Sequence, residues 1–256
     1  MGTNVIRVGS LFAGIGGFEL GIERAIPNAK TIWQVEQDPF CQSILKKHWP
    51  DATIYNDVCT VGAHNLQPID ILLGGFPCQD ISTAGTQRGI EHGTRSGLWW
   101  EMHRIIMELR PRIVIMENVS NILRLGGTTV VGSLAQIGYN CEWSVISARQ
   151  FGAPHLRKRW FGIAYPNGTR FQKQYECKLL EPSGGSRGRD SENGGIHIRN
   201  YWEEQTNPPG FCNVDDGIPN RLAKLKALGN AIVPQCSEYI GQCVIQSGLL
   251  DDLINQ

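Results

Sequence analysis

The sequence lacks the features that define several protein classes. Its 256 residues carry 24 basic and 24 acidic side chains, so the net charge is zero and a uniformly basic nucleic-acid coat protein is excluded. No apolar run approaches the ~20 residues that a membrane-spanning helix needs. No charged and then apolar signal segment opens the chain, so we expect a cytoplasmic protein with reduced cysteines.

Metal-binding spacing is also missing. None of the eight cysteines forms a C-x-x-C pair, and none clusters with histidine at the spacing of a zinc site. We therefore predict no metal. The chain contains no internal repeat or coiled-coil heptad, and its length suits one large domain or a domain with an insertion.

A short apolar run at residues 69–73 stops at two glycines and is followed by Pro77 and Cys78. Branched aliphatic residues bounded by Gly and Pro predict a buried strand that delivers Cys78 onto a loop. In open α/β sheets, ligands bind beyond the carboxyl ends of the strands, so Cys78 is a candidate nucleophile. From position alone, a buried structural cysteine is an equally good interpretation.

The N-terminal stretch predicts a strand at residues 5–8, a glycine turn, and a helix at residues 19–25. Such a turn lets the backbone approach a ligand, and the helix N-terminus can bind a carboxylate or phosphate. A dinucleotide fingerprint would need a further glycine at position 19, where the sequence has Glu19. This disfavours a nicotinamide-dependent dehydrogenase.

Two acids follow the next predicted strands. Glu36 ends a strand at residues 31–36, where a doubly wound sheet places the carboxylate that binds a ribose diol. Asp57 follows a short strand at residues 53–55 and is placed to accept a hydrogen bond from an adenine amino group. An Asx turn or a helix N-cap explains Asp57 equally well.

A third acid, Glu117, follows the apolar strand at residues 111–116. Partial desolvation there would raise its pKa and allow it to donate a proton near neutrality. Taken alone, Glu117 is more typical of a solvated strand-end acid. Arg157 and Arg159 are expected on one face of an extended segment, where they would bind an anion or form a solvated basic run.

The motifs, in this order, resemble those of the bacterial and phage DNA (cytosine-5) methyltransferases. They are the cofactor loop LFAGIGGF at 11–18, FPCQ at 76–79, ENV at 117–119, R-x-R at 157–159 and GNAIVP at 229–234. The resemblance covers roughly residues 5–164 and 219–236. Ser10 stands where many members have Asp, and His155 where many have Gln, although neither is a proposed catalytic residue.

The resemblance implies an α/β fold, a class I methyltransferase Rossmann-like domain with a mostly parallel sheet. Residues 1–164 and 219–256 would form the catalytic, adenosylmethionine-binding domain. Residues 165–218, rich in Gly, Pro, Asn and Ser, would be a small irregular target-recognition insert that forms the other wall of a DNA cleft.

The implied reaction transfers a methyl group from S-adenosyl-L-methionine to C5 of a flipped-out cytosine through a covalent bond between Cys78 and C6, leaving S-adenosyl-L-homocysteine. The catalytic residues would be Cys78, Glu117, Arg157 and Arg159. The implied cofactor-binding residues are Phe12, Gly14, Ile15, Gly16, Gly17, Glu36, Gln37, Asp57, Val58, Pro77, Leu98, Asn230 and Ala231.

The implied partner is double-stranded DNA in the nucleoid, and we expect a monomer to bind it. The sequence leaves open whether a cognate restriction endonuclease accompanies the protein. The candidate DNA-binding residues are Gln79, Ser82, Arg88, Arg95, Arg187, Arg189, Arg199 and Arg221. Two alternatives share these motifs: an RNA cytosine-5 methyltransferase, and a catalytically idle DNA-binding protein. The presence of both Cys78 and Glu117 disfavours the second.

Overall fold

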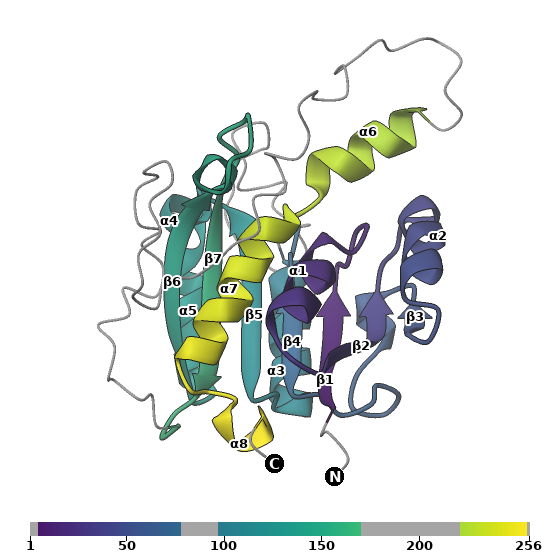
Figure 1. Ribbon diagram of the computed structural model, residues 1–256. Helices are drawn as coiled ribbons and strands as arrows, with labels where there is room; N and C mark the ends of the chain where they lie inside the picture. The colour runs from purple at the N-terminus through teal and green to yellow at the C-terminus, as the bar shows by residue number, and fades with distance from the viewer. Residues whose placement is uncertain (1–4, 78–96, 170–220, 255–256) are drawn as a thin grey trace.

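The computed structural model describes residues 5–77, 97–169 and 221–254. Within these ranges, seven strands form one sheet in the order β3-β2-β1-β4-β5-β7-β6 (Figure 1). The strands are β1 (Ile6–Leu11), β2 (Ala29–Val35), β3 (Thr53–Tyr55), β4 (Ile71–Gly74), β5 (Ile113–Val119), β6 (Tyr139–Ser147) and β7 (Lys158–Pro166). All pairs from β3 to β5 are parallel, and β7 runs antiparallel to both of its neighbours. The expected mostly parallel α/β sheet is confirmed.

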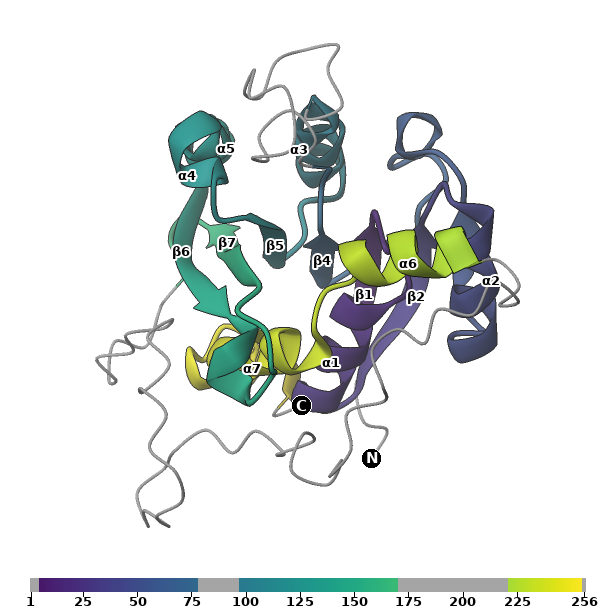
Figure 2. The same cartoon turned by 90° about the horizontal axis from the view of Figure 1, so that it is seen from above.

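Helices cover both faces of this sheet. They are α1 (Gly17–Ala25), α2 (Pro39–His48), α3 (Leu98–Leu109), α4 (Ile122–Leu125), α5 (Gly127–Gln136), α6 (Arg221–Asn230), α7 (Pro234–Gln246) and α8 (Asp251–Ile254), with short 3-10 turns η1 (Val58–Thr60) and η2 (Ala148–Phe151). Figure 2 shows α1 and α7 on one face of the sheet and α3 and α5 on the other.

The central strands are mostly apolar because both of their faces are buried. In β5, Ile113 and Ile115 join the core under α1 and α7, whereas Val114 and Met116 join the core under α3 and α5. Successive side chains of a strand point to opposite faces, so a strand between two helix layers needs a continuous apolar run. Burial of each such side chain contributes roughly 1.5–3 kcal/mol.

A close contact between α1 and α7 brings the C-terminal segment back to the N-terminal turn. A Cβ on Gly21 would lie 2.1 Å from Ser237 Oγ and 2.3 Å from the carbonyl oxygen of Pro234, so only glycine allows this approach. The Ser237 hydroxyl also donates a 3.0 Å hydrogen bond to the carbonyl oxygen of Gly17. The two ends of the sequence therefore meet beside the glycine turn.

The structure corrects two predicted boundaries. The amphipathic pattern predicts a last helix from about residue 235 to 250, but α7 ends at Gln246, two residues before Gly248 with its φ of +73°. β5 continues through Glu117 to Val119, because these residues pair with the antiparallel β7. β7 itself ends at Pro166. Apolar residues recur at helical spacing over residues 98–109, which predicts a helix there, and α3 confirms it.

None of the helices in the described ranges has both the length and the apolar character needed to cross a membrane.

Candidate active site

A cavity of about 260 Å³ opens at the carboxyl edge of the sheet. It lies where the strand order reverses between β1 and β4, the place where open α/β sheets bind ligands. Its lining comes from the glycine turn, the ends of β2, β4 and β5, β7 and α6. The lining residues are Phe12, Ala13, Gly14, Ile15, Gly17, Phe18, Glu36, Asp38, Cys41, Gly75, Phe76, Pro77, Glu117, Asn118, Val119, Arg159, Lys226, Ala227, Asn230, Ala231 and Ile232.

The turn between β1 and α1 has an unusual backbone. Phe12, Gly14 and Gly16 all have positive φ values, of +58°, +58° and +86°. A bulky residue such as Phe12 rarely adopts this conformation, and such strain clusters at ligand-binding sites. A Cβ on Gly17 would lie 2.2 Å from the carbonyl oxygen of Ile232, so the turn and the C-terminal segment meet backbone to backbone.

Glu36 holds this turn in place. Its Oε2 accepts a 2.7 Å hydrogen bond from the backbone N–H of Gly14, and its Oε1 accepts a 2.8 Å hydrogen bond from the N–H of Asp38. Each carboxylate oxygen has further acceptor capacity, which can receive the two hydroxyls of a ribose. A Cβ on Gly14 would have no atom within 4 Å among the described residues, so open space lies directly beside the turn. This donor and acceptor set fits the amino-acid and ribose parts of adenosylmethionine.

Glu117 is buried and faces the same cavity. The residue is 8% exposed, and its Oε1 lies 3.0 Å from Nε of Arg159. Burial raises the pKa of Glu117 to about 7, although the nearby Arg159 and Arg157 guanidinium groups oppose the rise. The expected increase in pKa is confirmed, and the alternative of a solvated acid is wrong. Oε2 would lie 3.5 Å from a Cβ on Gly75, three positions before Cys78.

Asn118 fixes the chain that leads toward Cys78. Its Nδ2 donates a 3.1 Å hydrogen bond to the buried carbonyl oxygen of Phe76, and its Oδ1 accepts one of 2.8 Å from the N–H of Val119. Sequence reasoning named Asn118 only as part of a motif. The structure gives it a specific task, because it ties the end of β5 to the segment after β4.

The sequence led us to expect Arg157 and Arg159 on one face of a strand, and this prediction is wrong. β7 begins at Lys158, and Arg157 precedes it with a φ of +30°. The Arg157 guanidinium donates a 2.9 Å hydrogen bond from Nη1 to the carbonyl oxygen of Gly229, and another from Nη2 (2.5 Å) to that of Ala231. Arg159 instead pairs with Glu117. Side chains alternate with a period of two only within a strand, and Arg157 lies outside β7.

The predicted cofactor residues divide into two groups. Those that line the cavity are Phe12, Gly14, Ile15, Gly17, Glu36, Pro77, Asn230 and Ala231, and those that do not are Gly16, Gln37, Asp57, Val58 and Leu98. Asp57 caps η1, because its Oδ1 accepts a 2.9 Å hydrogen bond from the N–H of Cys59. The N-cap interpretation of Asp57 is therefore confirmed.

A charged pair at the rim of the cavity was missed. Nζ of Lys226 on α6 lies 2.9 Å from Oδ2 of Asp38, which precedes α2. This ion pair holds the pKa of Asp38 below its usual value. From the sequence, Lys226 is expected only to contact the DNA backbone together with Arg221 and Lys224. No local pattern joins Lys226 to Asp38, because the two residues lie so far apart in the chain.

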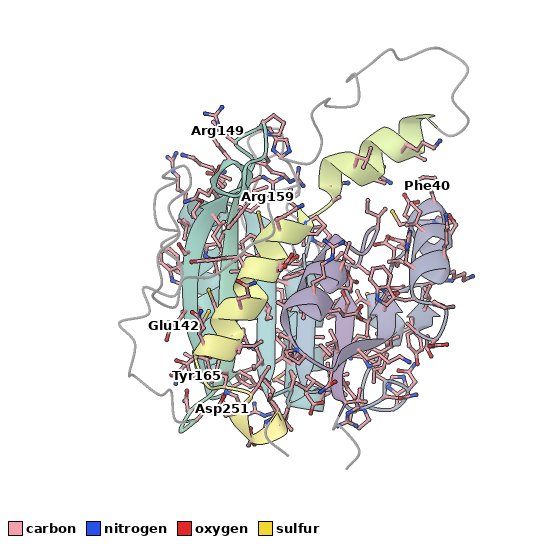
Figure 3. The ribbon with its side chains drawn as sticks, in the orientation of Figure 1. Phe40, Glu142, Arg149, Arg159, Tyr165 and Asp251 are labelled. Carbon is pink, nitrogen blue, oxygen red and sulfur yellow. The ribbon has the colours of Figure 1, made fainter. Side chains whose placement is uncertain are left out.

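The remaining predicted residues lie outside the described part of the chain. They are Cys78, Gln79, Ser82, Arg88, Arg95, Arg187, Arg189 and Arg199, and of Arg221 only the backbone at the start of α6 is described. Among the described basic residues, Arg149 and Arg159 lie toward the same end of the sheet, as Figure 3 shows. Arg149 belongs to the short turn η2 and is exposed.

A second buried carboxyl group, Glu19, belongs to α1 and is not among the residues that line the cavity. Its side chain is fully buried, and burial raises its pKa to about 7 although Ser10 and Gln34 form hydrogen bonds with it. Among the described residues, no partner reaches Glu19 Oε2. A neutral acid tolerates this environment better than a carboxylate.

The amino-acid sequence is similar to those of known DNA methylases. The family model of the C-5 cytosine-specific DNA methylases matches residues 6–185. The chain is 32% identical over 237 residues to the Type II methyltransferase M.CviJI of Paramecium bursaria Chlorella virus IL3A, covering 91% of this chain and 58% of that protein. It is 32% identical over 171 residues to the Type II methyltransferase M.HhaI of Haemophilus parahaemolyticus, covering 65% and 51%. The chain thus spans about half the length of the curated relatives it matches.

A solved structure agrees in fold. The Entamoeba histolytica methyltransferase EhMeth superposes with a TM-score of 0.65 and 14% sequence identity, and the match covers 97% of this chain and 99% of that one. At this identity the likeness concerns the fold alone, which is that of a Rossmann-like class I methyltransferase.

Proposed function

Because the chain belongs to the C-5 cytosine-specific DNA methylase family, we propose that it transfers a methyl group from S-adenosyl-L-methionine to C5 of cytosine in duplex DNA. One observation carries the proposal. The buried acid Glu117, paired with Arg159, lines the same cavity as the glycine turn and Glu36. A proton donor and a cofactor cradle thereby open onto one space.

The chemistry of cytosine explains why a nucleophile is needed. C5 of cytosine is not nucleophilic enough to attack a sulfonium methyl group directly. Attack by the Cys78 thiolate on C6 forms a carbon–sulfur bond and moves an electron pair toward C5. Adenosylmethionine then supplies the methyl group. Loss of the C5 proton, followed by elimination of the thiolate from C6, restores the aromatic ring and frees Cys78.

Glu117 stabilises the charge that this attack creates. Protonated Glu117 donates a hydrogen bond or its proton to N3 of the base, so that negative charge does not build up on the ring. With a pKa of about 7, it holds that proton in a large fraction of molecules near neutral pH. Arg159 keeps the carboxyl oriented through its 3.0 Å contact.

The cofactor is held by the other side of the cavity. The glycine turn would receive the amino-acid carboxylate, and Glu36 would receive the ribose hydroxyls. Phe12 and Ile15 contribute apolar surface to the same lining. The Lys226–Asp38 ion pair closes the rim between α6 and α2.

The DNA side of the proposal rests on sequence. The target base must leave the duplex, because a stacked ring hides the faces that react, and this costs a few kcal/mol. Residues 165–218 are proposed as the target-recognition region. Replacing residues 168–214 with a Gly/Ser linker should leave cofactor affinity nearly unchanged and abolish sequence-selective DNA binding. Methylation confined to the original site after this replacement would contradict the domain assignment.

Bisulfite sequencing of host DNA tests the activity. The protein is expressed in a host that lacks its own cytosine methylation, and we expect protected cytosines within one short sequence. Cys78→Ser should leave every cytosine unprotected, and DNA with 5-fluorocytosine should trap the wild type covalently but not this variant. Methylation of structured RNA alone, with duplex DNA untouched, would replace this proposal with its RNA alternative.

A further inference from the structure

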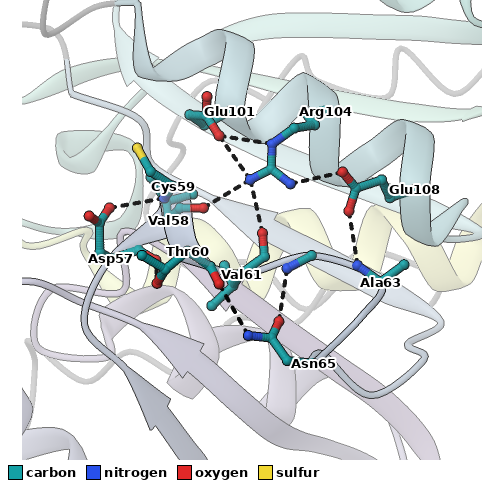
Figure 4. Close-up of polar contacts among 11 residues, drawn as sticks. Asp57, Val58, Cys59, Thr60, Val61, Ala63, Asn65, Glu101, Arg104 and Glu108 are labelled. Carbon is teal, nitrogen blue, oxygen red and sulfur yellow. Dashed lines mark hydrogen bonds and ion pairs between the residues drawn. The ribbon is translucent and has the colours of Figure 1, made fainter.

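A polar cluster outside the cavity centres on Arg104 of α3 (Figure 4). Its Nε and Nη2 reach the Glu101 carboxylate at 2.9 and 2.8 Å, and its Nη1 reaches Glu108 at 2.8 Å. Nη2 also donates to the carbonyl oxygens of Val58 and Val61, at 3.0 and 2.9 Å. One guanidinium therefore joins α3 to a loop more than forty positions earlier in the chain.

The loop is the one that follows β3. Besides the two carbonyl groups bound by Arg104, its Ala63 N–H donates a 2.9 Å hydrogen bond to Oε2 of Glu108. These contacts with Arg104 and Ala63 hold the pKa of Glu108 below its usual value. A Cβ on Gly62 would lie 2.3 Å from Glu108 Oε2, so the backbone approaches α3 as closely as glycine permits.

Two further bonds hold the far side of the loop. The Tyr55 hydroxyl donates a 2.9 Å hydrogen bond to the carbonyl oxygen of Asn65, and the indole N–H of Trp33 donates one of 2.9 Å to that of Gln67. These anchors lie at residues 65 and 67. Arg104 binds the backbone at the start of the loop through the carbonyl oxygens of Val58 and Val61, and the Asn65 amide binds it at Thr60 and Gly62.

That start carries Asp57 and Val58, which the resemblance assigns to the cofactor site, although neither is among the residues that line the cavity. Asp57 caps η1 and is exposed, while Val58 packs its side chain into the core and offers its carbonyl oxygen to Arg104. Loss of Arg104 would leave the carbonyl groups of Val58 and Val61 without this donor and free the backbone next to Asp57. The orientation of Asp57 thus depends on a residue of α3.

We propose that Arg104 is a positioning residue that holds the turn at residues 57 and 58 in the shape that receives the adenine ring of adenosylmethionine. This inference rests on the proposed function, since it assumes that cofactor. Arg104 acts through the backbone and makes no contact with the reacting atoms. Lys offers a point charge in place of a planar fork, so it can replace only part of the contacts.

Calorimetry with two ligands tests the role. S-Adenosylhomocysteine and S-inosylhomocysteine differ at the purine 6-position. The adenine ligand has an amino group there, which would donate a hydrogen bond to Asp57, and the inosine ligand has an oxygen. The wild type should prefer the adenine ligand. In Arg104→Met the ratio of the two dissociation constants should fall by about five- to tenfold, on the scale of one well-placed hydrogen bond. Arg104→Lys should fall between the two.

Arg110→Met is the matched control, because Arg110 ends the same helix and its Nη1 donates a 2.7 Å hydrogen bond to another loop, at the carbonyl oxygen of Ile137. This variant should keep the wild-type ratio. A merely structural role for Arg104 would lower the melting temperature without changing the ratio. If Arg104→Met does not fold, Glu108→Gln, which weakens the same cluster, should reduce the ratio in the same direction.

Three results overturn the inference. The first is an unchanged ratio in a folded Arg104 variant, which leaves the proposed function intact. The second is a wild type that binds both ligands equally, which removes the adenine contact. The third is a wild type that binds neither ligand, which refutes the proposed function as well.

Discussion

Glu117 and Glu19 are both buried acids, and burial raises the pKa of each to about 7. Their surroundings differ. Glu117 faces a cavity and lies 3.0 Å from a guanidinium nitrogen of Arg159. Glu19 lies between α1 and the sheet, hydrogen bonded to Ser10 and Gln34. A perturbed pKa marks a functional site only where a ligand can reach the group.

The two acids therefore have separable consequences. Glu117 should govern the reaction, because its proton can reach a substrate. Glu19 should affect the pH dependence of folding alone, because it does not line the cavity, whereas the raised pKa of Glu117 contributes to that dependence as well as to the reaction. Substitution by Gln at each site keeps the size of the side chain and removes the titration, which gives a matched pair of variants.

The largest effect is expected for Glu117→Gln. Glutamine can still donate a hydrogen bond but cannot supply a proton, so the single-turnover rate of methyl transfer should fall by roughly 10²–10⁴-fold. Rapid-quench measurement with labelled adenosylmethionine gives this rate. Glu19→Gln should stay within about threefold of the wild type on the same scale. Equal losses in both variants would break the distinction between the two acids.

The second effect concerns stability. Below pH 4.5, Glu19 is protonated in the folded and unfolded states alike. Between pH 4.5 and about 7 the unfolded state ionises first, so the unfolding free energy falls as pH rises, and above 7 the loss is complete. Glu19→Gln should remove this fall, which amounts to about 3 kcal/mol.

Urea unfolding at pH 5 and pH 8 measures this difference. The variant should gain stability relative to the wild type at pH 8 and show little change at pH 5. A difference between the two proteins that is the same at both pH values would show that Glu19 does not titrate in this range.

The smallest effect is expected from Arg159. Burial raises the pKa of Glu117, and the positive charge of Arg159 lowers it, so Arg159→Met should raise that pKa further. The active form carries the proton, and the rate should fall with rising pH through this pKa. The falling limb should therefore move upward by about one pH unit or more in Arg159→Met.

Arg159→Lys keeps the charge and should leave the limb almost in place. The measurement is the pH dependence of the single-turnover rate for the three proteins, each normalised to its own maximum. A falling limb that stays fixed in Arg159→Met would assign the titration to another group.

The fold followed from the sequence to a large extent because it rests on local patterns. The apolar run that became β5 and the helical spacing that became α3 each predicted an element, and α3 was placed at its observed limits. The end of the last helix was missed, since Gly248 stops α7 through a positive φ that the apolar spacing does not reveal.

The site followed less completely because its key contacts join distant residues. The glycine turn and Glu36 directly follow their strands, and Glu117 lies near the carboxyl end of β5, so their common edge could be predicted. The pairing of Lys226 with Asp38 and the carbonyl contacts of Arg157 depend on how α6 returns to the sheet. The burial of Glu19 was missed for a different reason, because a helix sequence does not show which face a single acid occupies.

Release of tritium from DNA labelled at cytosine C5 tests the central claim most directly. Methyl transfer to C5 must expel the C5 proton, so wild-type protein with adenosylmethionine should release one tritium for each methyl group incorporated. Glu117→Gln should slow both events together, and Glu19→Gln neither. Methyl groups that enter DNA while the tritium stays on the base would contradict the assignment of this cavity to C5 methylation.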